Sequence, residues 1–188
     1  MTTPHLVAHD STGEWDAKAD DPDRAVEIHG FQRLDDGATM LVETSSDGYD
    51  CRLLEVEAGS STVRTEFTLV TKDKNTHADT RNATKTTAGT YLVAHENDGA
   101  VREYAADGSG EVIWEFEIPL FGKERENGVD GHGPSAFGNK CYSALRLENG
   151  NTLIGGGNGH SILEVSHEKE IVWSVQRQHL PHHTSVLT

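Results

Sequence analysis

The sequence predicts an all-β fold made of repeated four-stranded units, because one pattern of short strands and tight turns recurs along the chain. The clearest copy is Gly89–Pro119, which reads as strand, turn, strand, turn, strand. Its two turns, at 96–99 and 106–110, carry the Asn, Asp and Gly residues that favour tight hairpins. Apolar residues fall at every second position from Val112 to Ile118, the period of a strand with one buried face.

Weaker copies of this pattern lie on both sides of the clearest one. The strands predicted in them are 26–34, 39–43, 52–56 and 62–69 before it, and one from 140 followed by 152–155, 161–165 and 170–175 after it. In this alignment Leu41, Leu92 and Leu153 share one position of the repeat. The tryptophans share another, which predicts that they pack between neighbouring units: Trp15, Trp114 and Trp173.

Four-stranded repeats of this length predict a β-propeller, in which each blade buries its faces against the next one. The predicted boundaries are a partial blade at 5–18, full blades at 26–70, 75–119 and 139–177, and a partial blade at 181–188. Two arrangements stay open for the terminal pieces. They meet within one chain in a four-bladed ring, or a larger ring is completed by a second copy or by further sequence.

The chain is strongly acidic, with 31 Asp and Glu against 16 Lys and Arg in 188 residues and a formal net charge of −15. The negative electrostatic field of such a chain repels nucleic acid and anionic membranes, so neither is predicted as a partner. High solubility and adaptation to concentrated salt, which screens an acidic surface, both explain the charge. The first residues lack the basic and apolar segments of a secretory signal. We therefore expect a cytoplasmic protein if this N-terminus is native, and an extracytoplasmic fragment otherwise.

One motif in the clearest copy points to a known group of propellers. Ala105, Asp107, Gly110 and Trp114 follow the pattern Ala-x-Asp-x-x-x-Gly-x-x-x-Trp with one residue fewer between Asp107 and Gly110, and the start of the chain holds a shortened version, Ala8, Asp10, Gly13 and Trp15. This pattern resembles the tryptophan-docking repeat of pyrroloquinoline-quinone-like (PQQ-like) propellers. The segments HENDGAVREYAADG, LRLENGNTLIGGGNGHSILEV and EKEIVWSV look like uncharacterised bacterial repeat proteins of that group.

The resemblance implies a fold more than a function, because propellers of this kind carry many activities. Its distant relatives include arylsulfotransferase-type propellers. The quinone enzymes of the group carry an adjacent Cys-Cys pair and a calcium-binding set of carboxylates, and this sequence shows neither. The quinone is therefore not predicted as a cofactor.

Four histidines recur at about the spacing of the blades: His29, His77, His132 and His182. Equivalent positions of successive blades form a ring around the central channel, where neutral imidazoles are able to ligate Zn²⁺ or Mn²⁺. A chance match is the competing interpretation, because the chain holds eleven histidines and the spacing is loose. The spacing thus predicts a divalent metal as the one candidate cofactor.

The segment 77–81 supplies a second candidate site. His77, Asp79 and Arg81 share one face if this segment is an inner strand. They offer an acid or base, a carboxylate that orients it, and a guanidinium able to hold a sulfate or a uronate carboxylate. A structural ion pair between Asp79 and Arg81 explains the same residues. His95, Glu96 and His132 are predicted to contribute to binding nearby.

Three classes of function fit these observations. The first is a non-catalytic scaffold whose channel face binds a carbohydrate, a small anionic ligand or a protein. The second is an enzyme acting on anionic substrates, such as a polysaccharide lyase or an arylsulfotransferase-like enzyme, through His77 and Arg81. A quinone-dependent oxidoreductase is third.

Overall fold

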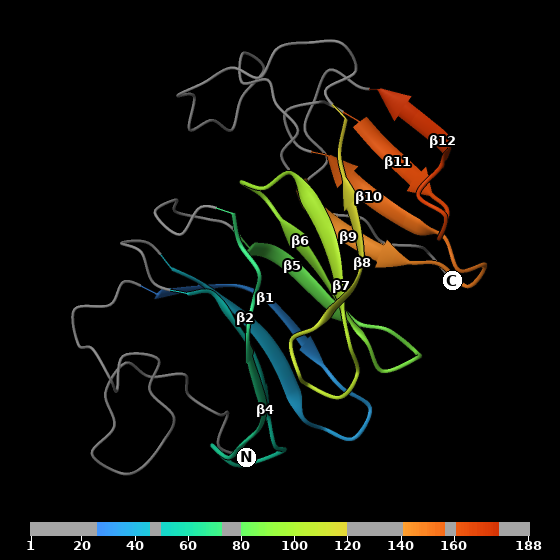
Figure 1. Ribbon diagram of the computed structural model, residues 1–188. Helices are drawn as coiled ribbons and strands as arrows, with labels where there is room; N and C mark the ends of the chain where they lie inside the picture. The colour runs from blue at the N-terminus through green and yellow to red at the C-terminus, as the bar shows by residue number, and fades with distance from the viewer. Residues whose placement is uncertain (1–25, 46–49, 73–79, 120–140, 157–160, 177–188) are drawn as a thin grey trace.

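The structure, a computed structural model, describes residues 26–45, 50–72, 80–119, 141–156 and 161–176 (Figure 1). These residues form three four-stranded sheets, each with its strands in chain order. Every neighbouring pair within a sheet is antiparallel. The predicted all-β repeat of four-stranded meanders is confirmed. The predicted partial blades at 5–18 and 181–188 lie outside the described residues.

We refer to the three sheets as blades 1, 2 and 3. Blade 1 consists of β1 (Val26–Arg33), β2 (Thr39–Ser45), β3 (Arg52–Val56) and β4 (Val63–Thr68). Blade 2 consists of β5 (Thr80–Lys85), β6 (Tyr91–His95), β7 (Ala100–Tyr104) and β8 (Val112–Glu117). Blade 3 consists of β9 (Cys141–Arg146), β10 (Thr152–Gly156), β11 (Ser161–Val165) and β12 (Ile171–Gln176).

The same turn joins the first two strands of every blade. It contains Gly37, Gly89 or Gly150, with φ of 85°, 83° and 86°. Glycine reaches this left-handed region without the steric cost that a Cβ brings, so the three turns fix the alignment of the blades. With the turns superposed, the residue that matches Leu92 and Leu153 is Met40.

The sequence alignment of Leu41 with Leu92 was therefore wrong by one residue. Leu41 instead matches Val93 and Ile154, which face the opposite side of their blades. The physical reason is that the second strand of a blade is buried on both faces. Met40, Leu41 and Val42 are all buried, so hydrophobic alternation leaves the register of this strand undefined.

Most of the core lies between the blades, and a small third cluster of Leu41, Leu54 and Val56 lies on the side of blade 1 turned away from blade 2. One apolar cluster fills the space between blades 1 and 2, and a second fills the space between blades 2 and 3. The inner strands β1, β5 and β9 lie side by side (Figure 1). Gly30 allows the first of these contacts, because a Cβ there would lie 2.9 Å from Val42 Cγ2 and 3.0 Å from the backbone nitrogen of Ala83.

The prediction that the tryptophans pack between blades holds for one of the two described tryptophans and not for the other. Trp114 of β8 is only 4% exposed, and its indole N–H donates to the carbonyl of His167 in blade 3 at 2.8 Å. Packing between blades is thus confirmed for Trp114. For Trp173, which occupies the same position in β12, the expectation was wrong: its side chain is 50% exposed. Blade 3 is the last described blade, so no described sheet packs on that face. Trp15 lies outside the described residues.

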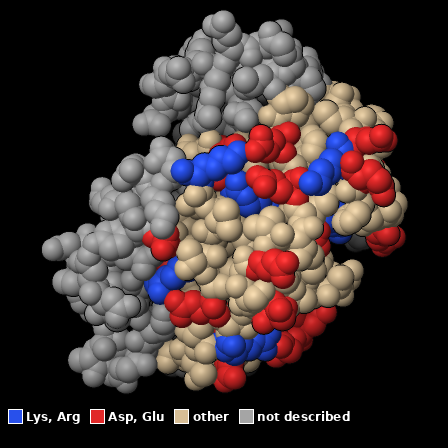
Figure 2. All heavy atoms as spheres, in the orientation of Figure 1, with Lys and Arg blue, Asp and Glu red and all other residues tan. Residues whose placement is uncertain are grey.

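Charged side chains of both signs are distributed over the described face of Figure 2. Figure 2 shows Lys and Arg lying beside Asp and Glu on this face rather than in separate fields. Among the described residues, no helix is long and apolar enough to cross a membrane.

Candidate functional site

The two ends of the blades are built differently. At one end lie the short glycine-bearing turns between the first and second strands. At the other end the chain passes from one blade to the next, and the inner strands β1, β5 and β9 begin there. Loops on a rigid scaffold are the usual place for binding residues, so the second end is where a site is expected.

Each inner strand carries a β-bulge close to its start. The register against the second strand shifts around His29 in β1, around Arg81 in β5 and around Tyr142 in β9. A bulge adds one residue to a strand and re-aims its side chain. The three residues therefore occupy one repeat position, and the structural equivalents of His29 are an arginine and a tyrosine.

These bulge residues make contacts both within a blade and from one blade to the next. His29 Nδ1 lies 3.0 Å from the carbonyl oxygen of Thr80. The Nε of Arg81 donates to the carboxylate of Glu96, which follows β6. The guanidinium carbon of Arg81 lies 5.9 Å from the ring centroid of Tyr142, a cation–π geometry. We call His29, Arg81, Glu96 and Tyr142 the bulge cluster.

Within the bulge cluster, Arg81 is held on two sides. Its side chain is 24% exposed, whereas Glu96 and Tyr142 are buried. A buried carboxylate that pairs with a guanidinium restrains its position, and the aromatic ring restrains its plane. The arrangement is able to hold a planar set of N–H donors at the surface in one orientation.

Burial, together with the nearby Glu96 carboxylate, raises the pKa of Tyr142 to about 12, although the guanidinium of Arg81 opposes this shift. The ordinary value is 10.0, so Tyr142 is a neutral phenol at physiological pH. The unfolded chain loses this proton near the ordinary pKa and the folded chain only near the raised one. The stabilisation is therefore complete below the ordinary pKa and is lost as the pH rises through the raised pKa.

Replacing Tyr142 with phenylalanine tests this shift. Two pKa units correspond to about 2–3 kcal/mol, so the wild type is expected to lose about 2 kcal/mol more than Tyr142→Phe between about pH 9 and pH 12. Urea unfolding of both proteins across this pH range measures the difference between their free energies of unfolding. The other titrating groups are the same in both proteins, so their contributions cancel in this difference. If the free energy of unfolding changed equally with pH in the two proteins, the pKa of Tyr142 would not be raised by folding.

The residues predicted from the sequence are partly brought together. Arg81 and Glu96 contact each other as partners in one site. His77, Asp79, His132 and His182 lie outside the described residues, so their predicted roles stay predictions. Within the described part of the chain, no group of three or more His, Cys, Asp or Glu residues is arranged to hold a metal ion.

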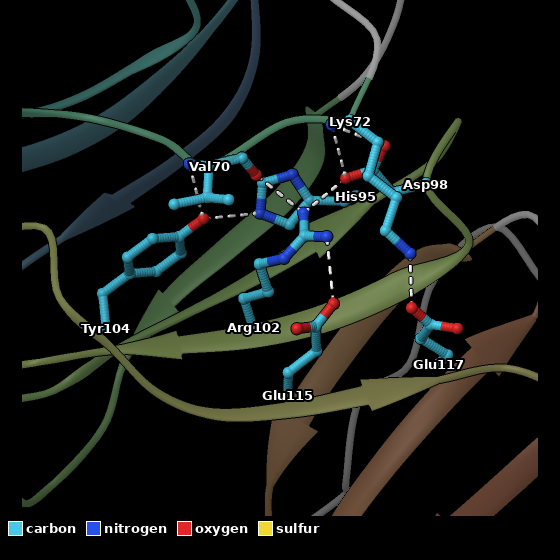
Figure 3. Close-up of polar contacts among 8 residues, drawn as sticks. All are labelled: Val70, Lys72, His95, Asp98, Arg102, Tyr104, Glu115 and Glu117. Atoms are coloured by element: carbon cyan, nitrogen blue, oxygen red, sulfur yellow. Dashed lines mark hydrogen bonds and ion pairs between the residues drawn. The ribbon is translucent and has the colours of Figure 1, made fainter.

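His95, which immediately precedes Glu96, belongs to a buried network of blade 2 (Figure 3). Its Nε2 is 3.0 Å from the hydroxyl of Tyr104, which accepts a hydrogen bond from the backbone N–H of Val70. Its side chain is 0% exposed. This network fastens the segment after β4 to blade 2, so the described contacts of His95 are structural.

Arg102 is the centre of the same network, and the sequence analysis did not single it out. Figure 3 shows its guanidinium between the carbonyl of Val70 and the carboxylates of Asp98 and Glu115. Asp98 also accepts the backbone N–H of Lys72. One available signal was the arginine in a strand whose other residues read as buried, because such a charge requires a partner.

Comparison with solved structures identifies the architecture. A protein of unknown function from Bacteroides caccae is 22% identical to this chain with a TM-score of 0.59, and the match covers 80% of this chain and 46% of that one. A catalytically inactive variant of virginiamycin B lyase from Staphylococcus aureus, solved with quinupristin, is 14% identical with a TM-score of 0.56, covering 82% and 43%. The Dos1 propeller is 11% identical with a TM-score of 0.54, covering 82% and 35%.

The fold is a β-propeller. Since the identities are this low, the likeness extends to the propeller architecture alone. The chain spans less than half the length of these three solved structures. No protein-family model and no curated protein matches the sequence. The predicted β-propeller is confirmed, whereas the narrower PQQ-like assignment still rests on the sequence motif.

Proposed function

We propose that the protein is a binding propeller whose bulge cluster recognises a carbohydrate or small ligand bearing a carboxylate. The observation that carries this proposal is the position of Arg81. Its side chain is partly exposed at the end where the inner strands begin, and Glu96 and Tyr142 contact its guanidinium there. A pre-ordered arginine loses little side-chain entropy on binding, and its planar fork matches a carboxylate.

The ion pair also explains how an acidic protein binds an acidic ligand. The overall charge of −15 repels an anion at long range, but this field is screened beyond about 8 Å at physiological salt. At contact distance the charge-assisted hydrogen bonds of the guanidinium dominate, and each is worth about 1.5–3 kcal/mol. We therefore expect the affinity for an acidic sugar to rise when salt is increased moderately from a low level.

The test compares two arginine-to-lysine variants of the full chain. Arg81→Lys keeps the charge but removes the planar guanidinium and its paired N–H donors. The affinity of this variant for a glucuronate-containing oligosaccharide is therefore expected to fall about tenfold or more. Arg64→Lys is the matched control, because Arg64 also pairs with carboxylates but lies with Asp36 at the opposite end of the blades. Titration calorimetry measures both proteins, with a neutral glucose oligosaccharide as the reference ligand.

Three results would contradict the proposal. They are equal binding of the acidic and the neutral oligosaccharide, absence of binding to the acidic one, and equal effects of the two substitutions. Circular dichroism of Arg81→Lys confirms that the variant is folded before it is titrated.

A second candidate is an enzyme that acts on an anionic polysaccharide through Arg81. The observation that favours it is the imidazole of His29, which occupies the repeat position equivalent to Arg81 in the neighbouring blade. The similar propeller from Staphylococcus aureus is itself a lyase. Incubation of the chain with polyuronate, followed by ultraviolet detection of unsaturated sugar ends, distinguishes this candidate. Product formation that is lost in His29→Ala would favour the enzyme over the binding protein.

A further inference from the structure

The inner strand of every described blade ends in a cation, and two of the three cations pair with a glutamate of the preceding blade. Lys85 of blade 2 pairs with Glu55 of blade 1, and Arg146 of blade 3 pairs with Glu103 of blade 2. The third cation is Arg33, the last residue of β1. Among the described residues, no carboxylate pairs with Arg33. Arg33 therefore occupies a position that binds a carboxylate at both described contacts between blades, without such a partner of its own.

The guanidinium of Arg33 is held by the turn that follows β1. Its Nη1 donates to the carbonyl of Gly37 at 2.5 Å, as Nη1 of Arg146 donates to the carbonyl of Gly150 at 2.9 Å. The Arg33 side chain is nevertheless exposed to solvent. A guanidinium carries five N–H donors in one plane, so a single bond to a carbonyl leaves most of them for a ligand. A side chain that is already restrained also loses less conformational entropy when a ligand binds.

An aromatic ring lies on the same face of β1 as this guanidinium. Phe31 and Arg33 are two residues apart in the strand, so their side chains point to the same side. The positions equivalent to Phe31 hold Ala83 in blade 2 and Ala144 in blade 3, and both alanines are buried. Phe31 is 76% exposed instead. Its ring is therefore available for contact with a ligand.

The accessible part of this face is small. Leu41, Leu54 and Val56 lie on the same side of blade 1 and are at most 2% exposed, so they are not available for contact. A stable protein–protein interface buries about 800 Å² on each partner, far more than two side chains offer. A ring and a guanidinium side by side are suited to a small molecule.

We propose that Phe31 and Arg33 form a binding site for a small aromatic carboxylate. The carboxylate takes the place of the glutamate that pairs with the equivalent cations, and it accepts charge-assisted hydrogen bonds from the guanidinium. The aromatic ring packs on Phe31 in an offset or edge-to-face arrangement. Residues two apart along a strand are separated by about 6–7 Å, a distance that a ring with a carboxylate on a short linker spans.

This site is independent of the proposed carbohydrate site. Arg33 lies at the end of the blades that carries the glycine turns, whereas Arg81 of the bulge cluster lies where the inner strands begin. The two sites also differ in chemistry, because the ligand of the first is recognised through an aromatic ring.

The probe is naphthylacetate, and saturation-transfer NMR titrations measure its dissociation constant for the full chain. Two reference compounds each keep one half of the probe. Naphthylacetamide has the ring without the charge, and acetate has the carboxylate without the ring. Each reference compound is expected to bind at least about threefold more weakly than naphthylacetate, because each makes only one of the two contacts.

Two substitutions test the two side chains. Phe31→Ala is expected to weaken the binding of naphthylacetate about fivefold or more, and Arg33→Gln about threefold or more. Arg33→Gln is also expected to abolish the preference for naphthylacetate over its amide. Both residues are exposed, so both variants are expected to keep the stability of the wild type, which urea unfolding checks.

Matched control variants remove the same kinds of group elsewhere on the surface. Ile113→Ala removes an apolar side chain that is 51% exposed, and Lys169→Gln removes an exposed cation next to β12. Neither control is expected to change the dissociation constant of naphthylacetate.

Three results would overturn the proposal. Equal affinities of the wild type for naphthylacetate and its amide would mean that Arg33 does not bind the carboxylate. Equal effects of the test substitutions and the controls would mean that the compound binds elsewhere on the protein. Absence of saturation transfer up to about 10 mM naphthylacetate would mean that the two side chains do not form a site.

Discussion

Replacing Trp114 with alanine is expected to lower the free energy of unfolding by about 3–5 kcal/mol, the cost of truncating a buried aromatic residue. The indole lies between blades 2 and 3. It stacks on Phe116 with ring centroids 6.3 Å apart, and the guanidinium carbon of Arg146 lies 5.3 Å from its ring centroid. Its N–H donates to the carbonyl of His167. Truncation would open a cavity at the contact that joins the two blades.

Urea unfolding of the full chain measures this loss, and the neighbouring residue provides the control. Ile113 precedes Trp114 in β8 but is 51% exposed, so Ile113→Ala is expected to cost less than about 1 kcal/mol. Trp114→Phe keeps most of the apolar surface and removes the hydrogen bond, so an intermediate loss is expected. A loss below about 1 kcal/mol for Trp114→Ala would show that this ring does not hold the blades together.

The architecture was predictable because the sequence repeats the same pattern of strands and turns several times. Each blade repeats the glycine turn, and each turn requires a positive φ that few other residues adopt. Trp114 was predictable for the same reason, since its strand alternates clearly and its motif recurs. Repetition therefore identified the strands, the blades and one of the contacts between them.

The side chains of the candidate site were harder to predict, because they depend on bulges. The β-bulge at Arg81 interrupts the two-residue alternation of β5 and re-aims its side chain. One partner of Arg81 is Glu96, which follows β6. A bulge does not change the pattern of hydrophobic residues enough to be recognised in the sequence. The pairing of Arg81 with Glu96 was therefore visible only in the structure.

Arg102 illustrates a second limit of sequence reasoning. Its strand, β7, is buried along its whole length, and local pattern does not show where an arginine in such a strand finds its counter-charges. Asp98 is near in sequence, but the carbonyl of Val70 belongs to the connection from blade 1. Long-range pairing of this kind is set by how the blades pack.

Replacing Arg102 with methionine is expected to destabilise the protein by about 3–5 kcal/mol, because it leaves a buried charge uncompensated. The side chains of Arg102 and Asp98 are each only 2% exposed. Without the guanidinium, Asp98 keeps just its hydrogen bonds from the Lys72 backbone, and the carbonyl of Val70 loses its donor. The connection between blades 1 and 2 would then be held less firmly.

A second substitution distinguishes the lost charge pair from lost packing. Asp98→Asn removes the negative charge but keeps an oxygen that accepts the Lys72 N–H. In the Arg102→Met background this change is expected to cost much less than in the wild type, so the two effects are not additive. Arg64→Met is the control and is expected to cost at most about 1 kcal/mol, because Asp36 is exposed to solvent and Glu55, the buried second partner of Arg64, keeps its ion pair with Lys85. Additive losses in urea unfolding would mean that Arg102 stabilises the blade by packing its aliphatic stem, with its charge already compensated by water.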